Sequence, residues 1–222
     1  MARSQLLTDL ASGNDIESVL FRLKIILSDL ENESIDKWLD NEIEGYDPNE
    51  ELPSYRILQG RVMGSYILSS TFDAYEYTSA LIPINHIPIE ERETLLTAHT
   101  RYGISSLKNM LKTNEKLAKQ ISPEDCHKYS REGFTITKMY IEFGLVDIEK
   151  VIAKIKNTLL KIILKLEKEF NELDSLDIFT DVSNKELIEQ TEQFIINILL
   201  DNSITIGDNN KIKSSEIGHN KQ

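Results

Sequence analysis

Hydrophobic residues recur every three or four positions over much of the chain, a spacing that predicts amphipathic helices. The first predicted helix follows Asn14, whose side chain is a suitable N-cap. Its apolar residues are Ile16, Val19, Leu20, Leu23, Ile26, Leu27 and Leu30. A second helix is predicted from about Ser34 to Gly45, because glycine tolerates the left-handed conformation that ends many helices. Together these segments predict a helical hairpin.

The pattern changes between Pro53 and Pro83, where aromatic and β-branched residues are interrupted by glycine, serine and threonine. This composition predicts two or three short antiparallel strands. Another strand is predicted over residues 133–143, where apolar and polar side chains alternate.

Helical spacing returns after Pro88, and helices are predicted from there to about Tyr102 and over residues 104–121. The strongest periodicity covers residues 147–170. A last amphipathic helix is predicted within residues 183–201, where Ser183 and Glu186 have capping-box spacing. The predicted fold class is α-dominated α+β: a helical bundle with a small antiparallel sheet and a short, solenoid-like C-terminal β tail. The predicted units are a body at 1–173, the helix at 183–201 and the tail at 202–222.

The tail repeats Ile-Gly-x-Asn at Ile206 and again at Ile217. Stacked β units normally need three or more copies to bury a continuous core, so a short tail would need neighbouring subunits. The predicted oligomerisation residues are Ile204, Ile206, Ile212 and Ile217. We therefore expect a homo-oligomer; the alternative is an unstructured terminus.

Composition limits the classes of partner. The formal net charge of −12 and the isoelectric point near 4.9 oppose binding of nucleic acid or anionic lipid by the protein as a whole. Cys126 is the single cysteine, which excludes an internal disulfide and fits a reducing compartment. The sequence has neither a secretory signal nor an uncharged run of the roughly 18 residues that span a bilayer. A cytoplasmic protein without a membrane partner is predicted.

Catalytic motifs are absent from the sequence: it has no phosphate-binding glycine loop, dinucleotide fingerprint, nucleophile elbow or zinc-protease helix. Asp125, Cys126 and His127 are adjacent, but a structural zinc site needs four placed ligands. The other histidines are scattered at His86, His99 and His219. We predict no catalytic residue, cofactor or metal.

Two groups of charged residues are candidates for binding. Nine carboxylates between residues 31 and 51 face only Lys37: Glu31, Glu33, Asp36, Asp40, Glu42, Glu44, Asp47, Glu50 and Glu51. Such oxygens suit Mg²⁺, but the stretch has no lysine or histidine at the fixed spacing of a nuclease site, so a solvated face or a partner-binding surface is the favoured explanation.

The second group is a lysine row within the helix predicted at 147–170. At about 100° per residue, its members fall within one narrow arc opposite the apolar face. They are Lys150, Lys154, Lys161, Lys165 and Lys168. This row predicts a surface for an anionic partner, for nucleic acid, or for the acidic stretch of a neighbouring subunit. The alternative is an ordinary solvated face.

One motif points to a known family. The residues from Trp38 to Tyr46 read Trp-Leu-Asp-Asn-Glu-Ile-Glu-Gly-Tyr, and those from Leu52 to Arg56 read Leu-Pro-Ser-Tyr-Arg. This order resembles the AbiTii family of bacterial abortive-infection proteins, over about residues 5–170. The resemblance implies a role against phage and assigns no catalytic residue.

The leading hypothesis is an antiphage protein that acts through self-assembly or through a phage or host protein partner, without an identifiable catalytic site. One alternative is a phosphate-directed enzyme such as a metal-dependent nuclease toxin. The other is a phage-sensing subunit of a multi-protein defence system.

Overall fold

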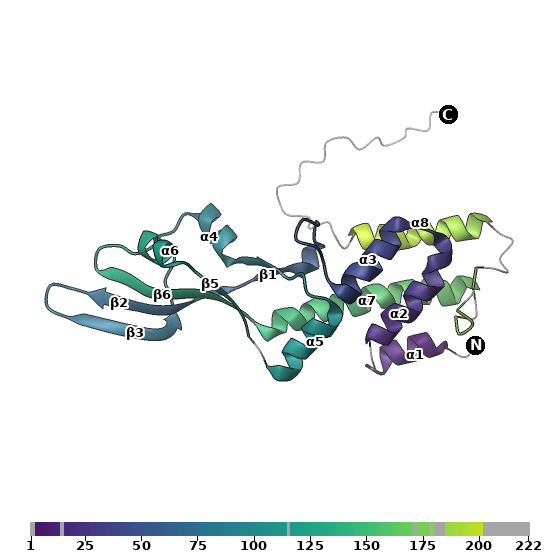
Figure 1. Cartoon of the computed structure of the whole chain (residues 1–222), viewed down its shortest axis with the longest axis horizontal. Helices are drawn as coiled ribbons and strands as arrows, with labels where there is room; N and C mark the ends of the chain where they lie inside the picture. The colour runs from purple at the N-terminus through teal and green to yellow at the C-terminus, as the bar shows by residue number, and fades with distance from the viewer. Residues whose placement is uncertain are drawn as a thin grey trace, which may run out of the picture.

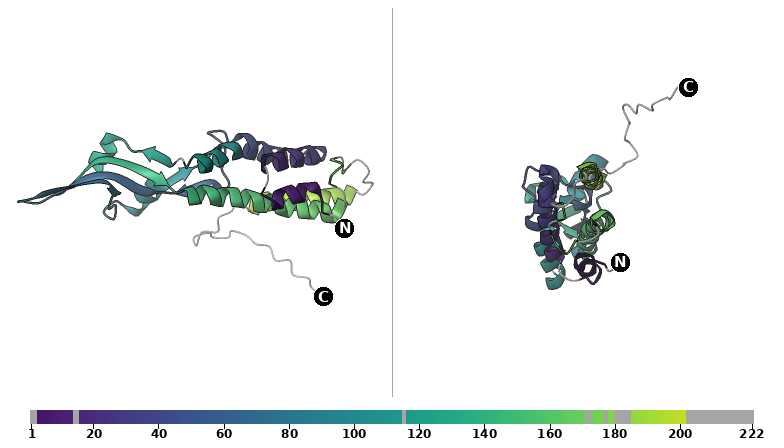
Figure 2. Two further views of the ribbon diagram at one scale, coloured as in Figure 1. Left: turned by 90° about the horizontal axis from the view of Figure 1, so that it is seen from below. Right: turned by 90° about the vertical axis from the view of Figure 1, so that its right-hand side faces the viewer.

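The computed structural model describes residues 3–13, 16–114, 116–170, 173–176, 178–179 and 185–201. The molecule is elongated, with most helices at one end and the strands reaching towards the other (Figure 1). The strands run roughly along the long axis, as Figure 2 shows from two further directions. Among the described residues, no helix combines the length and the apolar content needed to cross a membrane.

Six helices form the helical end: α1 (Gln5–Ala11), α2 (Ile16–Leu27), α3 (Glu33–Glu44), α5 (Ile104–Thr113), α7 (Leu145–Phe170) and α8 (Lys185–Asp201). The long helix α7 packs against α1, α5 and α8. Helix α3 begins where the Asn32 side chain accepts hydrogen bonds from the N–H groups of Ser34 and Ile35, and it ends at Gly45. Short 3-10 turns occupy Ser28–Leu30 (η1) and Ser54–Arg56 (η2).

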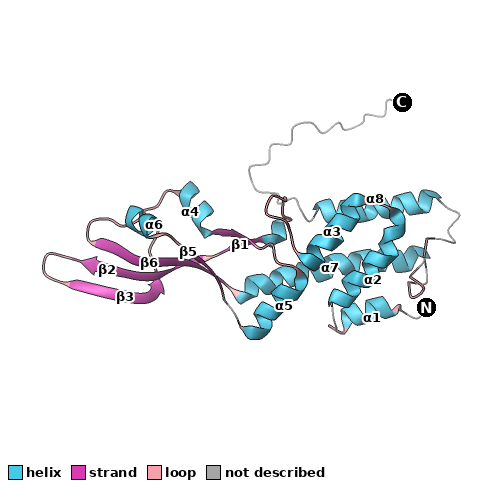
Figure 3. Cartoon of the chain, in the orientation of Figure 1, coloured by secondary structure: helices cyan, strands magenta, loops and turns pink. Residues whose placement is uncertain are grey.

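The other end contains two antiparallel sheets and two short helices (Figure 3). The larger sheet has the order β3-β2-β6-β5, formed by β2 (Arg61–Ser69), β3 (Ala74–Leu81), β5 (Leu117–Gln120) and β6 (Phe134–Phe143). A two-stranded ladder joins β1 (Ile57–Gln59) to β4 (Thr97–His99). The short helices are α4 (Ile89–Leu96) and α6 (Pro123–Lys128), and α6 packs against β6.

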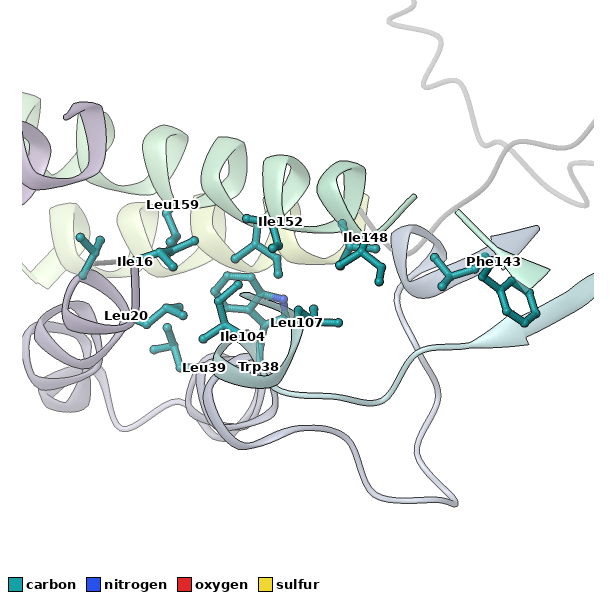
Figure 4. Packing of buried hydrophobic residues seen from close by; sticks show 14 of the residues in the cluster. Ile16, Leu20, Trp38, Leu39, Ile104, Leu107, Phe143, Ile148, Ile152 and Leu159 are labelled. Carbon is teal, nitrogen blue, oxygen red and sulfur yellow. The ribbon is translucent and has the colours of Figure 1, made fainter. Parts of the chain in front are cut away.

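One hydrophobic cluster continues from the sheet into the helices. Phe143 at the end of β6 is buried, and Gly144 alone separates this strand from α7. Figure 4 shows Phe143 beside Ile148, which is followed by Trp38, Leu107 and Ile152 between the helices. The strand end and the helix start therefore belong to the same core.

The prediction of a helical bundle with a small sheet is wrong: the fold is mixed α+β, with a four-stranded sheet and a separate two-stranded ladder. The helix predicted from Pro88 to Tyr102 ends at Leu96, since residues 97–99 pair with β1 as strand β4. Likewise, residues 117–120 leave the predicted helix and pair with β6. Both strands obtain their hydrogen bonds from distant segments, which local periodicity does not reveal.

Several other predictions are confirmed, namely helix α3, the strands between Pro53 and Pro83, strand β6 and helix α7. Helices α1 and α6 were not predicted, because each is too short to show a clear period. The predicted solenoid-like tail and its isoleucines (Ile204, Ile206, Ile212 and Ile217) lie outside the described residues, and no solenoid is present within them.

Candidate functional site

The family motif builds a buried ionic cluster between α3 and η2. Glu42 and Arg56 are both completely buried, and the Arg56 guanidinium donates to Glu42 Oε2. The other carboxylate oxygen, Glu42 Oε1, accepts from Tyr46 Oη at 2.6 Å and from Tyr55 Oη at 2.7 Å. The buried charge is therefore paired and surrounded by hydrogen-bond donors, as burial requires.

Further contacts fix the two tyrosines and the arginine. Trp38 Nε1 donates to Tyr55 Oη at 3.1 Å, and the Arg56 guanidinium lies 5.0 Å from the centre of the Tyr46 ring. Arg56 also donates to the Tyr102 carbonyl at 2.5 Å. Burial, together with the negative charge of Glu42, raises the pKa of both tyrosines far above its usual range, so both phenols stay protonated and can donate. The cluster thus ties α3 and η2 to the chain that precedes α5.

The predicted carboxylate group between residues 31 and 51 is dispersed. Glu42 is occupied by Arg56, Asp40 pairs with Lys24, and Glu50 pairs with Lys37 at 2.7 Å. Within the described part of the chain, no three His, Cys, Asp or Glu side chains come together as a metal site. The acidic stretch therefore contributes ion pairs between α3 and its neighbouring segments, and its other carboxylates do not form a metal site with the described residues.

The Asp125-Cys126-His127 group also does not converge. Cys126 is buried on α6, where burial raises the pKa of its thiol, while His127 is exposed. His86 lies elsewhere, with Nε2 at 2.8 Å from the Tyr129 carbonyl oxygen. Cys126, His127 and His86 therefore lie in different surroundings and do not form a common site.

All five predicted lysines lie on α7, and four of them are exposed: Lys150, Lys154, Lys161 and Lys168. The fifth, Lys165, is half-buried against α8, where it pairs with Glu169 at 3.0 Å and lies 5.3 Å from the centre of the Phe194 ring. Lys150 pairs with Asp147 at 2.9 Å. For the other three, the described residues offer no ion-pair partner. Four of the five lysines therefore form an exposed row, and Lys165 packs between α7 and α8.

An exposed apolar row runs beside the lysines. Val146, Ala153 and Leu160 are seven residues apart, which is two helical turns, and Leu164 follows one turn later. Their exposure is substantial, at 60% for Val146, 37% for Leu160 and 40% for Leu164. We call the exposed lysines and these apolar residues together the α7 strip. The apolar half of the strip was not predicted from the sequence, although the seven-residue spacing of Val146, Ala153 and Leu160 is visible there.

The α7 strip opens into a groove of about 540 Å³ at the N-terminal end of the helix. One wall consists of Asp147, Lys150 and Lys154; the opposite wall is the η2–β1 segment, with Ser54, Tyr55, Ile57, Leu58 and Gln59. The groove therefore joins the family motif to the lysine row. Only the tertiary structure reveals this, since the two walls are about ninety residues apart in the chain.

A second groove, of about 550 Å³, lies between α4, β5 and α6. Its charged lining has both signs, and one of its lysines, Lys128, pairs with Glu91 at 2.7 Å. This internal neutralisation makes it a weaker candidate for a charged ligand than the groove at α7.

Comparison with known proteins agrees with the motif. The AbiTii family matches residues 4–192, so the similarity extends into α8. No curated protein and no solved structure matches the chain. Because the family match covers most of the 222 residues, the protein belongs to the AbiTii family of abortive-infection proteins.

Proposed function

We propose that this AbiTii protein acts in abortive infection against phage by binding an acidic protein segment along the α7 strip. The observation that carries the proposal is the pairing of exposed lysines with an exposed apolar row on the same long helix. Family membership supports the antiphage role, and the chemistry of the strip supports the kind of partner.

The spacing on α7 suits a helical partner. Lys154, Lys161 and Lys168 repeat every seven residues, which is about 10 Å along a helix. The apolar residues repeat at the same interval beside them. A second amphipathic helix with carboxylates flanking leucine-like residues would match both rows, as in helix-in-groove recognition. The groove at residues 54–59 would receive the end of such a segment.

The apolar row favours protein over nucleic acid. Nucleic-acid binding relies on phosphate contacts and gains little from exposed valine and leucine. The net charge of −12 also repels a polyanion outside the strip itself. A short acidic segment avoids most of that repulsion because it contacts only the lysine row.

Charge reversal tests the lysine half of the proposal. The triple variant Lys154→Glu, Lys161→Glu and Lys168→Glu should abolish protection in a plaque assay and weaken binding of a synthetic Leu/Glu amphipathic peptide more than tenfold. The matched control reverses the charge of Lys112, Lys138 and Lys185, which are exposed on other elements. This control should retain both phage protection and peptide binding. Equal loss of protection in the two triple variants, with both folded, would contradict the proposal.

A second variant separates protein from nucleic acid. Leu160→Lys removes apolar surface but adds positive charge to the strip. We expect it to weaken peptide binding, whereas retention of a labelled oligonucleotide should rise if nucleic acid were the partner. Stronger oligonucleotide binding together with undiminished phage protection would overturn the choice of an acidic protein.

A further inference from the structure

A second candidate interaction surface lies at the sheet end of the molecule, opposite the six-helix end, where β3 forms one edge of the larger sheet (Figure 1). Strand β3 pairs with β2 only, so one row of its backbone N–H and C=O groups has no strand beside it among the described residues. Its residues from Ala74 to Ser79 are all exposed. Such an edge is a template for another strand.

The surface of this edge is aromatic. Tyr75 is 61% exposed and Tyr77 is 42% exposed, while Phe72 in the adjoining turn is 92% exposed. Tyr77 is stacked on Tyr66, with ring centres 4.8 Å apart, and Tyr66 in turn contacts Phe134. The aromatic layer that is buried over the middle of the sheet therefore continues, uncovered, onto its edge.

Two of the features that commonly protect an edge, lysine and proline, are missing from β3. Soluble proteins often place lysine, proline or inward-pointing charge on an edge strand to prevent pairing. The sequence Ala74–Leu81 contains neither lysine nor proline, and Glu76 is its only charged residue. The left-handed φ of 50° at Ser79 interrupts the strand near its end and leaves the earlier residues as the regular part.

We propose that β3 pairs antiparallel with β3 of a second copy of the chain, about a twofold axis at Tyr75. A self-complementary edge is what a twofold dimer requires, because the same patch is used by both subunits. The two four-stranded sheets would then form one continuous sheet, with the aromatic layers of both copies on the same side.

Charge repulsion and the interruption at Ser79 favour a twofold axis at Tyr75 over an axis at either of the next two residues. An axis at Glu76 would place the two carboxylates directly opposite each other, which is unfavourable. An axis at Tyr77 would extend the pairing through Ser79, where the strand is interrupted. With the axis at Tyr75, Glu76 faces Ala74 and Asp73 faces Tyr77, so no like charges are opposed and a phenol lies beside a carboxylate.

The overall shape permits the pairing. The strands follow the long axis of the molecule, and the helical part lies at one end (Figure 2). Antiparallel pairing of the hairpins therefore sends the two helical parts in opposite directions and leaves the α7 strip of each copy uncovered. The inference is independent of the proposed partner of that strip.

Sedimentation velocity over a wide concentration series tests the dimer in the full chain. We expect a monomer–dimer equilibrium in the wild type, and a monomer at every concentration in Tyr75→Lys and Tyr77→Lys. Thr137→Lys, an exposed substitution on central strand β6, is the matched control and should dimerise like the wild type. Far-UV circular dichroism verifies that each variant is folded.

A cysteine variant tests the axis without weakening the edge. Tyr75→Cys should form an intermolecular disulfide under mild oxidation, because residues on the axis face their own copies, whereas Thr137→Cys should not. A wild type that stays monomeric, a dimer that survives both lysine substitutions, or a dimer that disappears only when residues 202–222 are removed would overturn the proposal.

Discussion

At the scale of single residues, the family motif is best explained by burial of an ion pair. Glu42 has no exposed surface, and each of its oxygens has at least one donor. Trp38, Tyr46 and Tyr55 are needed around it because an isolated carboxylate would be too unfavourable in this interior. The motif is therefore a folding element that shapes one wall of the candidate groove through Tyr55.

The ion pair gives a prediction about stability. Glu42→Gln leaves the buried Arg56 guanidinium without its countercharge, so the free energy of unfolding should fall by about 3–5 kcal/mol. Urea unfolding followed by Trp38 fluorescence measures this. Glu44→Gln, two residues away and exposed, is the control and should change stability by less than about 0.5 kcal/mol. Equal effects of the two substitutions would show that the pair contributes little.

At the scale of elements, the end of α3 and the start of α5 approach each other at two glycines. Gly45 has a φ of 114°, and a Cβ atom there would lie 2.6 Å from the Arg101 carbonyl oxygen. Tyr46 N–H donates to the same carbonyl at 2.8 Å. A Cβ on Gly103 would in turn contact the backbone of Ile43 and Glu44. Glycine is therefore required at both positions to bring the two backbones together.

This close approach distinguishes Gly45 from an ordinary left-handed glycine. Gly45→Ala should lower the free energy of unfolding more than Gly13→Ala. Gly13→Ala should lower the free energy of unfolding only by the roughly 1–2 kcal/mol that a left-handed backbone costs a residue with a Cβ atom. The φ of Gly13 is 73°, and a Cβ there would meet nothing within 4 Å. Thermal unfolding of both variants checks the order. An equal decrease in the free energy of unfolding of the two variants would mean that the α3 and α5 backbones can move apart with little loss of stability.

At the scale of the whole molecule, sheet and helices share one core, although they occupy opposite ends of an elongated shape. The connection runs through Phe143 and Gly144 directly into α7. The one-residue connection and the continuous core join the hairpin edge and the α7 strip in one folded body.

The shared core predicts a single cooperative unfolding transition. Trp38 fluorescence reports on the helical end and far-UV circular dichroism on all secondary structure, so the two signals should change at the same denaturant concentration. Phe143→Ala should lower the free energy of unfolding by about 3–5 kcal/mol and move the midpoints of both signals together. Separate midpoints for the two signals would show that sheet and helices unfold independently.

The elements that the sequence pattern predicts correctly are those whose stability is mainly local. Helix α7 was predicted because its apolar face repeats over many turns, and α3 because its cap and terminal glycine are encoded beside it. The strands β4 and β5 were assigned to helices because their short sequences favour neither state strongly. Pairing with Ile57–Gln59 and with β6 decides their conformation.

The sequence by itself determined the lysine row, the acidic character of the chain and the motif that identifies the family, since each depends on residue type and spacing along the chain. Tertiary structure alone decided that Glu42 is buried against Arg56, that residues 54–59 face Lys150 and Lys154, and that β3 is an edge. These three facts depend on contacts between segments far apart in the chain, and side-chain burial and charge pairing act through distance in space.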